Sequence, residues 1–258
     1  MIDRPSPRTA SYRRLLAPAL LALLVAGGAA VAFATTDKAA PAAADRAAIE
    51  AVVREYILAH PEIIPEAIKR LQAKEMAQKV AEHRAELETP YKGAWEGAAQ
   101  PDVTLVAFMD YACGFCRASL PDLARLVKED PGLRIVYREL PIIAEGSAGA
   151  ARVSLLAAEG GRFMAFHKAM YAAGDVEPAT VLKVAGKVGL DPAKAQAALK
   201  SKAGDAPIME NVRLAQALDA TGTPMFVVGD QVFTGAVGYE VLKAAIAEAR
   251  QGKAADKG

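Results

Sequence analysis

The chain has only two cysteines in 258 residues, and they lie three positions apart as Cys113 and Cys116. No other cysteine exists to form a structural disulfide elsewhere in the fold. A structural zinc site needs four ligands, and the three histidines, His60, His83 and His167, are scattered without ligand spacing. We therefore predict no metal site and no cofactor.

An excess of charge of either sign is also lacking. The chain has 31 basic and 30 acidic residues, for a net charge of +1. Without residues 1–34, which contain four arginines and one aspartate, 27 basic and 29 acidic residues remain, for a net charge of −2. This balance offers no basic footprint, so we expect no nucleic-acid partner. A hydrophobic content of 53% suits a globular domain with a real core.

The first 34 residues have the layout of a secretory signal peptide. Four arginines precede an uncharged stretch from Leu15 to Ala34, which ends in the cleavage pattern Ala32-Phe33-Ala34. The stretch is long enough for an uncleaved membrane anchor, but Pro18 and its many alanines and glycines favour cleavage. The sequence therefore predicts export to an oxidising compartment, followed by a linker over residues 35–44.

Residues 45–90 predict two helices ahead of the main domain. The first starts at Asp45 and ends at His60-Pro61, and the second runs from Pro65 to about Leu87. Two helices with a narrow apolar face cannot bury enough surface alone. They must pack on the main domain or on copies of themselves, and their coiled-coil-like charge pattern favours oligomerisation. The second helix presents a thin apolar stripe: Ile64, Ile68, Leu71, Met76, Val80 and Leu87.

The stretch Cys113-Gly114-Phe115-Cys116 follows an apolar strand and opens a helix. A cysteine in the first turn of a helix faces unpaired N–H groups and the positive end of the helix dipole. Both stabilise a thiolate, which is the nucleophile of disulfide exchange. A thiol one turn later can release a substrate held as a mixed disulfide. A structural disulfide is the alternative, but so short a loop would add little stability. We predict a redox-active dithiol.

The main domain is predicted over residues 91–250 with an α/β fold. A strand at 103–109, a helix to about Lys128 that Pro121 interrupts, and a strand at 133–138 form one βαβ unit, so the two strands should be parallel. The preceding junction, which contains Trp95 as a packing residue, is predicted as turns over residues 88–100.

Residues 142–220 are too long for a simple crossover and predict an inserted helical subdomain. After it, Thr223-Pro224 leads into a strand, Gly229-Asp230 forms a hairpin turn, and a closing helix spans 239–250. The tail 251–258 is predicted to be disordered. The helices expected within the insertion are 148–159, 162–173, 179–188, 192–201 and 207–220.

The order of these motifs resembles the DsbA-like thioredoxin-fold family of thiol:disulfide oxidoreductases. The N-terminal region, with Arg54-Glu55-Tyr56-Ile57-Leu58 and His60-Pro61-Glu62, looks like that of the suppressor-of-copper-sensitivity C (ScsC) and Com1-type branch. Members of that branch can form trimers through this region. The motifs that carry the main resemblance are Phe108 to Cys116, Arg138-Glu139-Leu140-Pro141, Phe166-His167 and Thr221-Gly222-Thr223-Pro224.

The resemblance implies a thioredoxin fold in which Cys113 attacks and Cys116 resolves the mixed disulfide. It implies that Pro224 follows a cis bond, so that the backbone of Thr223 lies beside Cys113 and can pair with an extended substrate. The dipeptide Gly114-Phe115 tunes the redox potential. It lacks the histidine of strongly oxidising members, which implies a less oxidising protein.

One position departs from the family pattern. Many members carry a buried acid six residues before the first cysteine, thought to help proton transfer to the resolving thiol. Here that position is Ala107, so Glu139 or a water molecule would have to serve.

The resemblance implies a periplasmic enzyme that forms or isomerises disulfides in exported proteins. Its partners would be unfolded or misfolded substrates, a membrane redox partner and further copies of the chain, most simply in a trimer. Two other functions fit the same residues. Two soft thiolates suit copper(I), and the fold could serve as a non-catalytic adaptor.

Overall fold

The structure is a computed structural model that describes residues 43–202 and 205–255. The predicted signal peptide and most of the predicted linker lie outside these residues. Within them, no helix combines the length and apolar composition that crossing a membrane requires. The chain divides into two units, Met1–Tyr56 and Ile57–Gly258. The structure describes the first unit only from Ala43 to Tyr56, which is most of helix α1 (Ala43–Ala59). The apolar side chains of this helix are exposed: Ile49, Val52, Val53 and Tyr56.

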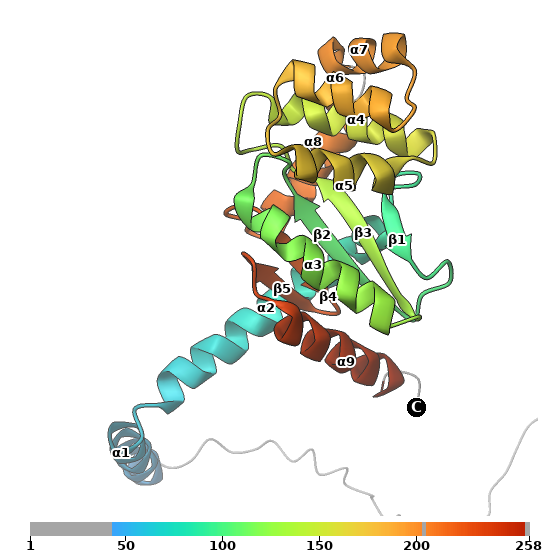
Figure 1. Cartoon of the computed structure of the whole chain (residues 1–258). Helices are drawn as coiled ribbons and strands as arrows, with labels where there is room; N and C mark the ends of the chain where they lie inside the picture. The colour runs from blue at the N-terminus through green and yellow to red at the C-terminus, as the bar shows by residue number, and fades with distance from the viewer. Residues whose placement is uncertain (1–42, 203–204, 256–258) are drawn as a thin grey trace, which may run out of the picture. The chain divides into compact units, whose positions relative to one another are not determined.

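The second unit is built on a five-stranded sheet in the order β1-β3-β2-β4-β5 (Figure 1). The two central strands, β2 and β3, are parallel and joined by helix α3 (Gly114–Glu129), which confirms the predicted βαβ unit. The other pairs are antiparallel. The strands are β1 (Trp95–Gly97), β2 (Val103–Met109), β3 (Leu133–Glu139), β4 (Met225–Val228) and β5 (Gln231–Thr234).

Helices cover both faces of the sheet, so β2 is buried along its whole length and reads as an apolar run rather than an alternating one. Leu105 and Ala107 face the side covered by α3 and by α9 (Tyr239–Ala255). Val106 and Phe108 face the side covered by α2 (Ile63–Glu88) and by α8 (Asp205–Ala217). The dithiol therefore lies where a fully buried strand ends and a helix begins.

Strand β1 was not predicted from the sequence, which assigned residues 88–100 to turns. It pairs with β3 at the sheet edge. The Trp95 ring lies under the Arg134 guanidinium, 4.7 Å from ring centroid to carbon. Gly97 has φ 96°, and a Cβ there would come 2.3 Å from the Leu133 carbonyl oxygen, so this strand needs glycine at its end. Three residues are too few to show an alternating pattern.

Five helices lie between β3 and β4, as predicted. They form the helical insertion and lead the chain back to the sheet. The Asp191 carboxylate caps α7 by accepting a hydrogen bond from the Lys194 N–H at 2.8 Å, as aspartate commonly does at a helix N-cap. These helices are α4 (Ser147–Glu159), α5 (Phe163–Ala173), α6 (Pro178–Lys187), α7 (Pro192–Lys200) and α8.

Two predicted helix boundaries are wrong. Helix α3 continues through Pro121, where an interruption was expected, because its packing on the sheet and on α9 outweighs the one lost hydrogen bond. Helix α9 continues to Ala255, so residues 251–255 of the predicted disordered tail are helical. The remaining tail residues lie outside the described part of the chain.

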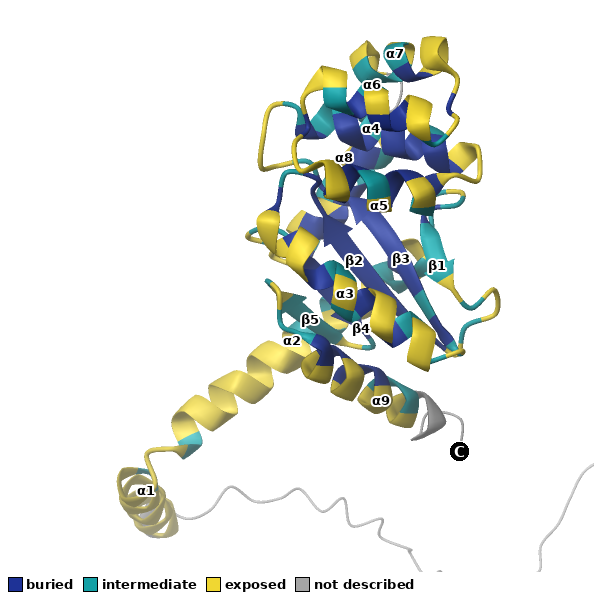
Figure 2. Cartoon of the chain, viewed as in Figure 1, coloured by how far each residue is buried: buried dark blue, intermediate teal, exposed yellow. Residues whose placement is uncertain are grey.

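Helix α2 has two different halves, although the sequence placed all of it in an N-terminal region ending at residue 90. Near its C-terminus, Val80 and Leu87 are each 1% exposed and pack with the sheet. Near its N-terminus, Ile64, Ile68 and Leu71 are 47%, 51% and 56% exposed, as the yellow first half of α2 in Figure 2 shows. The second half belongs to the core of the main domain.

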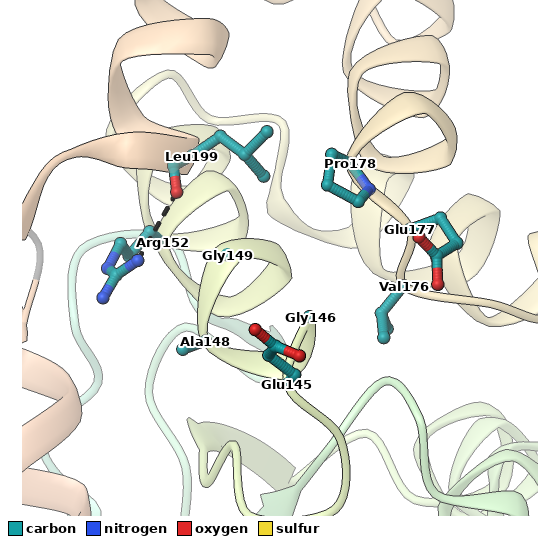
Figure 3. Close-up of a pocket in the computed structure, with 9 residues that line it drawn as sticks. All are labelled: Glu145, Gly146, Ala148, Gly149, Arg152, Val176, Glu177, Pro178 and Leu199. Atoms are coloured by element: carbon teal, nitrogen blue, oxygen red, sulfur yellow. Dashed lines mark hydrogen bonds between the residues drawn. The ribbon is translucent and has the colours of Figure 1, made fainter.

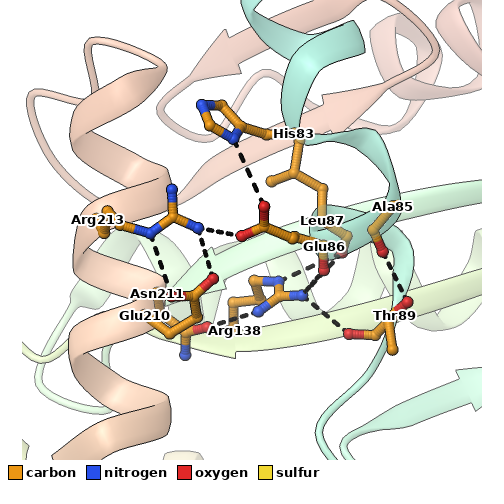
Figure 4. A network of polar contacts seen from close by, with 9 residues as sticks. All are labelled: His83, Ala85, Glu86, Leu87, Thr89, Arg138, Glu210, Asn211 and Arg213. Carbon is orange, nitrogen blue, oxygen red and sulfur yellow. Dashed lines mark hydrogen bonds and ion pairs between the residues drawn. The ribbon is translucent and has the colours of Figure 1, made fainter.

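A buried arginine, Arg138 of β3, holds the C-terminus of α2 (Figure 4). Its guanidinium donates to the Leu87 carbonyl at 3.2 Å, to the Thr89 carbonyl at 2.9 Å and to the Glu86 carbonyl. It also donates to the Asn211 side chain of α8 at 2.8 Å. The last carbonyls of a helix have no partner within the helix and form the negative end of its dipole. Arg138 therefore joins α2, β3 and α8.

Replacing Arg138 by methionine is expected to lower the free energy of unfolding by about 3 kcal/mol, because it leaves several carbonyls buried without donors. Urea unfolding followed by circular dichroism measures this. The control is Arg125→Met, since Arg125 is an exposed arginine of α3 paired with Glu129 at 2.8 Å, and its loss should cost less than about 1 kcal/mol. Equal losses in the two variants would show that Arg138 does not hold the helix end.

Candidate active site

The two thiols lie at the start of α3. Cys113 is the N-cap residue, with extended backbone angles of φ −82° and ψ 117°. Its Sγ accepts a hydrogen bond from the Cys116 N–H at 3.3 Å, so it uses one of the unpaired donors of the first turn. Between them, Gly114 has open space around its Cα, and the Phe115 side chain is 69% exposed. The dipeptide therefore faces solvent beside the thiols.

The two thiols differ in their surroundings. Cys113 keeps 4% of its surface exposed, whereas Cys116 has none. Burial raises the pKa of Cys116 well above that of a free thiol, and the nearby Asp110 backbone and Thr223 side chain oppose this only in part. The geometry suits attack by Cys113 and a later reaction of Cys116 inside the protein.

The structure brings Thr223 and Pro224 to this dithiol from the far end of the sequence. The bond between them is cis, as the resemblance implied. The Cys113 thiol donates to the Thr223 carbonyl oxygen at 3.2 Å. The Thr223 hydroxyl is buried and has no hydrogen bond of normal geometry within the described residues, but it is close enough to lower the pKa of Cys116.

Asp110 is a site residue that the sequence reasoning missed. Its carboxylate is buried and accepts from the Ala112 N–H at 2.8 Å and from the Ser147 hydroxyl at 2.7 Å. It also accepts from the N–H groups of Ile142 and Ile143, at 2.7 and 2.8 Å. Asp110 thus fixes the segment just before the dithiol to the loop after β3. Its place directly after a buried strand was the available signal.

Behind the dithiol, Glu139, Tyr111 and His167 form a buried chain of polar side chains, which Ser154 joins at Glu139. The Tyr111 hydroxyl donates to Glu139 Oε1 at 2.9 Å and lies 3.1 Å from His167 Nδ1. Ser154 also donates to Glu139, at 2.7 Å. Within the described residues, none of the side-chain hydrogen bonds of Glu139 reaches Cys116. Glu139 is therefore not a direct hydrogen-bond partner of the resolving thiol.

Burial sets the protonation of both ends of this chain. It raises the pKa of Glu139 to about 8, against the hydrogen bonds from Ser154 and Tyr111, and lowers the pKa of His167 to about 3. The folded protein thus prefers a neutral carboxyl and a neutral imidazole. His167 is packed in the core.

These pKa values predict how stability changes with pH. Above about pH 4.5 the unfolded chain releases the Glu139 proton that the folded protein keeps up to about pH 8, so stability falls as pH rises through this window. His167 has the opposite effect: between about pH 3 and 6.5 the unfolded chain binds a proton that the folded protein does not, so stability rises with pH. Between about pH 4.5 and 6.5 the two effects cancel, and above pH 6.5 Glu139 alone should lower the unfolding free energy by about 2 kcal/mol by pH 8.

Glu139→Gln should remove this loss, and urea unfolding at pH 6.5, 7.2 and 8 measures it. The control is Glu159→Gln, because Glu159 is a carboxylate that binds the Tyr91 hydroxyl at 2.6 Å near the surface. An unchanged slope in the Glu139 variant would contradict the assignment.

A separate cavity of about 530 Å³ lies within the helical insertion (Figure 3). Glu145, Glu177 and Arg152 line it, and Arg152 already binds the Leu199 carbonyl at 3.4 Å and Asp205 at 2.6 Å. None of the predicted site residues lines this cavity, so it is distinct from the dithiol site.

The α/β fold and the helix-capping dithiol opposite a Thr-cis-Pro turn define a thioredoxin-fold protein with an inserted helical subdomain. A sequence model of the DSBA-like thioredoxin domain matches residues 104–247, and one of the copper resistance protein ScsC N-terminal domain matches residues 45–78. The chain belongs to the DsbA-like thioredoxin family of thiol:disulfide oxidoreductases, with an ScsC-type N-terminal region.

Solved structures agree with this. A thioredoxin-like oxidoreductase from Silicibacter pomeroyi DSS-3 is 40% identical, with a TM-score of 0.58 over 61% of this chain and 91% of that one. A linker-deletion mutant of Proteus mirabilis ScsC is 25% identical, with a TM-score of 0.64 over 83% of this chain and 99% of that one.

Among curated proteins, the Na(+)/H(+) antiporter NhaA 3 of Salinispora tropica is 30% identical over 156 residues, which is 59% of this chain. The chain spans about a quarter of the length of the curated relatives it matches.

Proposed function

We propose that the protein is a periplasmic thiol:disulfide oxidoreductase that forms or isomerises disulfides in exported proteins through Cys113 and Cys116. The observation that carries this is the position of Cys113 Sγ, which caps α3, accepts the Cys116 N–H and faces the Thr223 carbonyl. A thiolate formed there is stabilised by the helix N-terminus and lies beside backbone that can pair with an extended substrate.

For isomerisation, the Cys113 thiolate attacks one sulfur of a wrong substrate disulfide, and the other sulfur leaves as a thiolate. That thiolate attacks a second disulfide of the substrate and expels another substrate thiolate. The expelled thiolate attacks the mixed disulfide, so Cys113 leaves as a thiolate and the pairing has changed with no net change in electrons. If the rearrangement stalls, Cys116 loses its proton and attacks Cys113. The substrate then leaves reduced by two electrons, and the protein becomes the disulfide.

For disulfide formation, the protein starts as the Cys113–Cys116 disulfide. A substrate thiolate attacks Cys113 and expels Cys116 as the leaving thiol. A second substrate thiolate then attacks the mixed disulfide, so the substrate leaves oxidised and the protein keeps two electrons. A membrane redox partner must remove these electrons, or supply them when the protein works as an isomerase.

The N-terminal features support the location and assembly. The signal-peptide layout of residues 1–34 directs the chain to the periplasm. The exposed stripe Ile64, Ile68 and Leu71 offers an apolar face for copies of the chain, and a trimer would place several dithiols around one substrate.

Refolding assays test this proposal and distinguish an oxidase from an isomerase. An oxidase speeds disulfide formation in reduced ribonuclease, and an isomerase speeds recovery of scrambled ribonuclease. The equilibrium of the dithiol with glutathione gives the redox potential. Because the dipeptide Gly114-Phe115 lacks the histidine of strongly oxidising family members, we expect a less oxidising value than theirs. A copper(I) binder would instead hold stoichiometric copper on the reduced thiols without exchange, and an adaptor would show neither property.

A further inference from the structure

The cavity of Figure 3 lies where α4, α6 and α7 meet, and we refer to it as the insertion cavity. Its volume of about 530 Å³ is in the range of small-ligand pockets. Two glycines bring its walls into contact. A Cβ on Gly146 would come 2.4 Å from the Val176 carbonyl oxygen, and a Cβ on Gly149 would come 2.9 Å from Leu199 Cδ1. The space is therefore enclosed by packed elements of the insertion.

The insertion cavity carries two carboxylates without a cation. Glu145 comes from the loop before α4 and Glu177 is the N-cap residue of α6, and Figure 3 shows them on different walls. Both are exposed, and neither side chain forms an ion pair or a hydrogen bond within the described residues. Arg152 also lines the cavity, but Asp205 neutralises it at 2.6 Å. The cavity therefore keeps an excess of negative charge.

An occupant has to match both the charge and the apolar part of the walls, which Val176, Pro178 and Leu199 provide. A lysine or arginine side chain has this chemistry. Its aliphatic stem can lie along apolar surface while its charged head remains with water and the carboxylates. An anion would be repelled, and an uncharged apolar group would leave the two carboxylates unmatched.

Two hydrogen bonds connect the walls of the insertion cavity to the dithiol. On the α4 side, Ser147 donates to Asp110 Oδ1 at 2.7 Å, and the same oxygen accepts the Ala112 N–H at 2.8 Å. On the α6 side, Arg117 follows the dithiol directly and donates to the Gly174 carbonyl at 3.1 Å. The cavity is therefore held beside the start of α3 from both of its sides.

One extended peptide can reach both places. Glu145 is two residues from Ser147, so the cavity begins within roughly 20 Å of Cys113. An extended chain covers that distance in about six residues.

We propose that the insertion cavity binds a lysine or arginine side chain of the polypeptide undergoing exchange, within about six residues of the cysteine attached to Cys113. This inference rests on the proposed function, and it names a sequence preference in the substrate. The stem of the basic residue packs on the apolar wall, and its charge pairs with Glu145 and Glu177.

The test uses peptides that carry one cysteine as a mixed disulfide with an aromatic thiol, which is the leaving group because of its low pKa. Lysine, norleucine or glutamate is placed at each position from about two to six residues away. At the best position, kcat/KM for lysine should exceed that for norleucine about three- to tenfold, the range of two partly exposed ion pairs. Glutamate should be slower than norleucine, and the differences should vanish in about 1 M salt. Equal rates at every position would overturn the inference.

Matched variants locate the effect. Glu145→Gln combined with Glu177→Gln should remove the lysine preference and leave exchange with an uncharged small disulfide, bis(2-hydroxyethyl) disulfide, unchanged. Glu240→Gln combined with Glu248→Gln changes the net charge equally at exposed positions of α9, outside the cavity lining, and should keep the preference. The same loss in both double variants, or in neither, would contradict the site.

A binding measurement separates this inference from the proposed function. Peptides with serine in place of cysteine cannot exchange, so calorimetry with them reports binding alone. Tighter binding of the lysine peptide than of the norleucine peptide, lost in the Glu145 and Glu177 double variant, supports the site even if exchange proves absent. Equal binding of the two peptides refutes it even if exchange proves fast.

Discussion

The Cys113→Ser protein should show no disulfide exchange above the uncatalysed rate, whereas the Cys116→Ser protein should accumulate as a mixed disulfide with its substrate. Cys113 Sγ caps α3, and Cys113 is the one cysteine of the pair with some exposed surface. The serine hydroxyl that replaces its thiol is not a nucleophile toward disulfides at neutral pH. Removing Cys116 leaves attack possible but removes the thiol that releases the substrate. Insulin reduction measures the first effect, and mass spectrometry of trapped adducts measures the second.

Both variants should remain folded, because each substitution conserves size in a position that forms no disulfide. Comparing the two with each other is therefore the control, since they remove one thiol each from the same helix turn. An adduct on Cys116 in the Cys113→Ser protein, with exchange retained, would mean that the roles of the two thiols are reversed.

Glutamate at Ile64, Ile68 and Leu71 should convert an oligomer into a monomer and abolish the recovery of scrambled ribonuclease. These side chains lie one helical turn apart on α2 and are about half exposed, so the charges should not disturb the core of the protein. They would place three carboxylates in the proposed apolar interface, where each is costly to bury. Light scattering on the protein from residue 35 onward measures the mass.

The matched control carries glutamate at Met209, which is 60% exposed on α8, outside the stripe. Shortening the chain to begin at Tyr91 is not a suitable test. It would remove Val80 and Leu87 from the core and the carbonyls that Arg138 binds. If the unmodified protein is already a monomer, or if the triple variant keeps its mass, the stripe is not an interface.

Helices and strands with a clear local sequence pattern could be predicted from the sequence alone. Strand β2 is an unbroken apolar run, and α3 begins directly after its N-cap Cys113 and ends just before Asp130, although it continues through Pro121. Where an element depends on a distant partner, sequence reasoning was not sufficient. β1 exists because three residues pair with β3. The stripe on α2 is periodic from Ile64 to Leu87, and periodicity alone cannot show which turns contact the sheet.

The site divides in the same way. Cys113, Cys116, Thr223 and Pro224 belong to motifs and come together in the structure as the resemblance implied. The contacts of Asp110 with the loop after β3, the pairing of Glu139 with Tyr111 and the meeting of Glu145 and Glu177 at one cavity come from tertiary packing. No local pattern in the sequence encodes these contacts.

The continuity of α2 sets the reach of any assembly that this protein forms. Its 26 residues run as one helix from Ile63 to Glu88, a rod of about 39 Å, and the same rod carries the apolar stripe at one end and is fastened to β3 and α8 by Arg138 at the other. Helix α2 therefore has no hinge between the apolar stripe and the sheet that carries the dithiol. In an assembly, the distance between the dithiols of neighbouring copies would then be fixed. Substrates would be selected by whether the separation of their disulfides matches that distance.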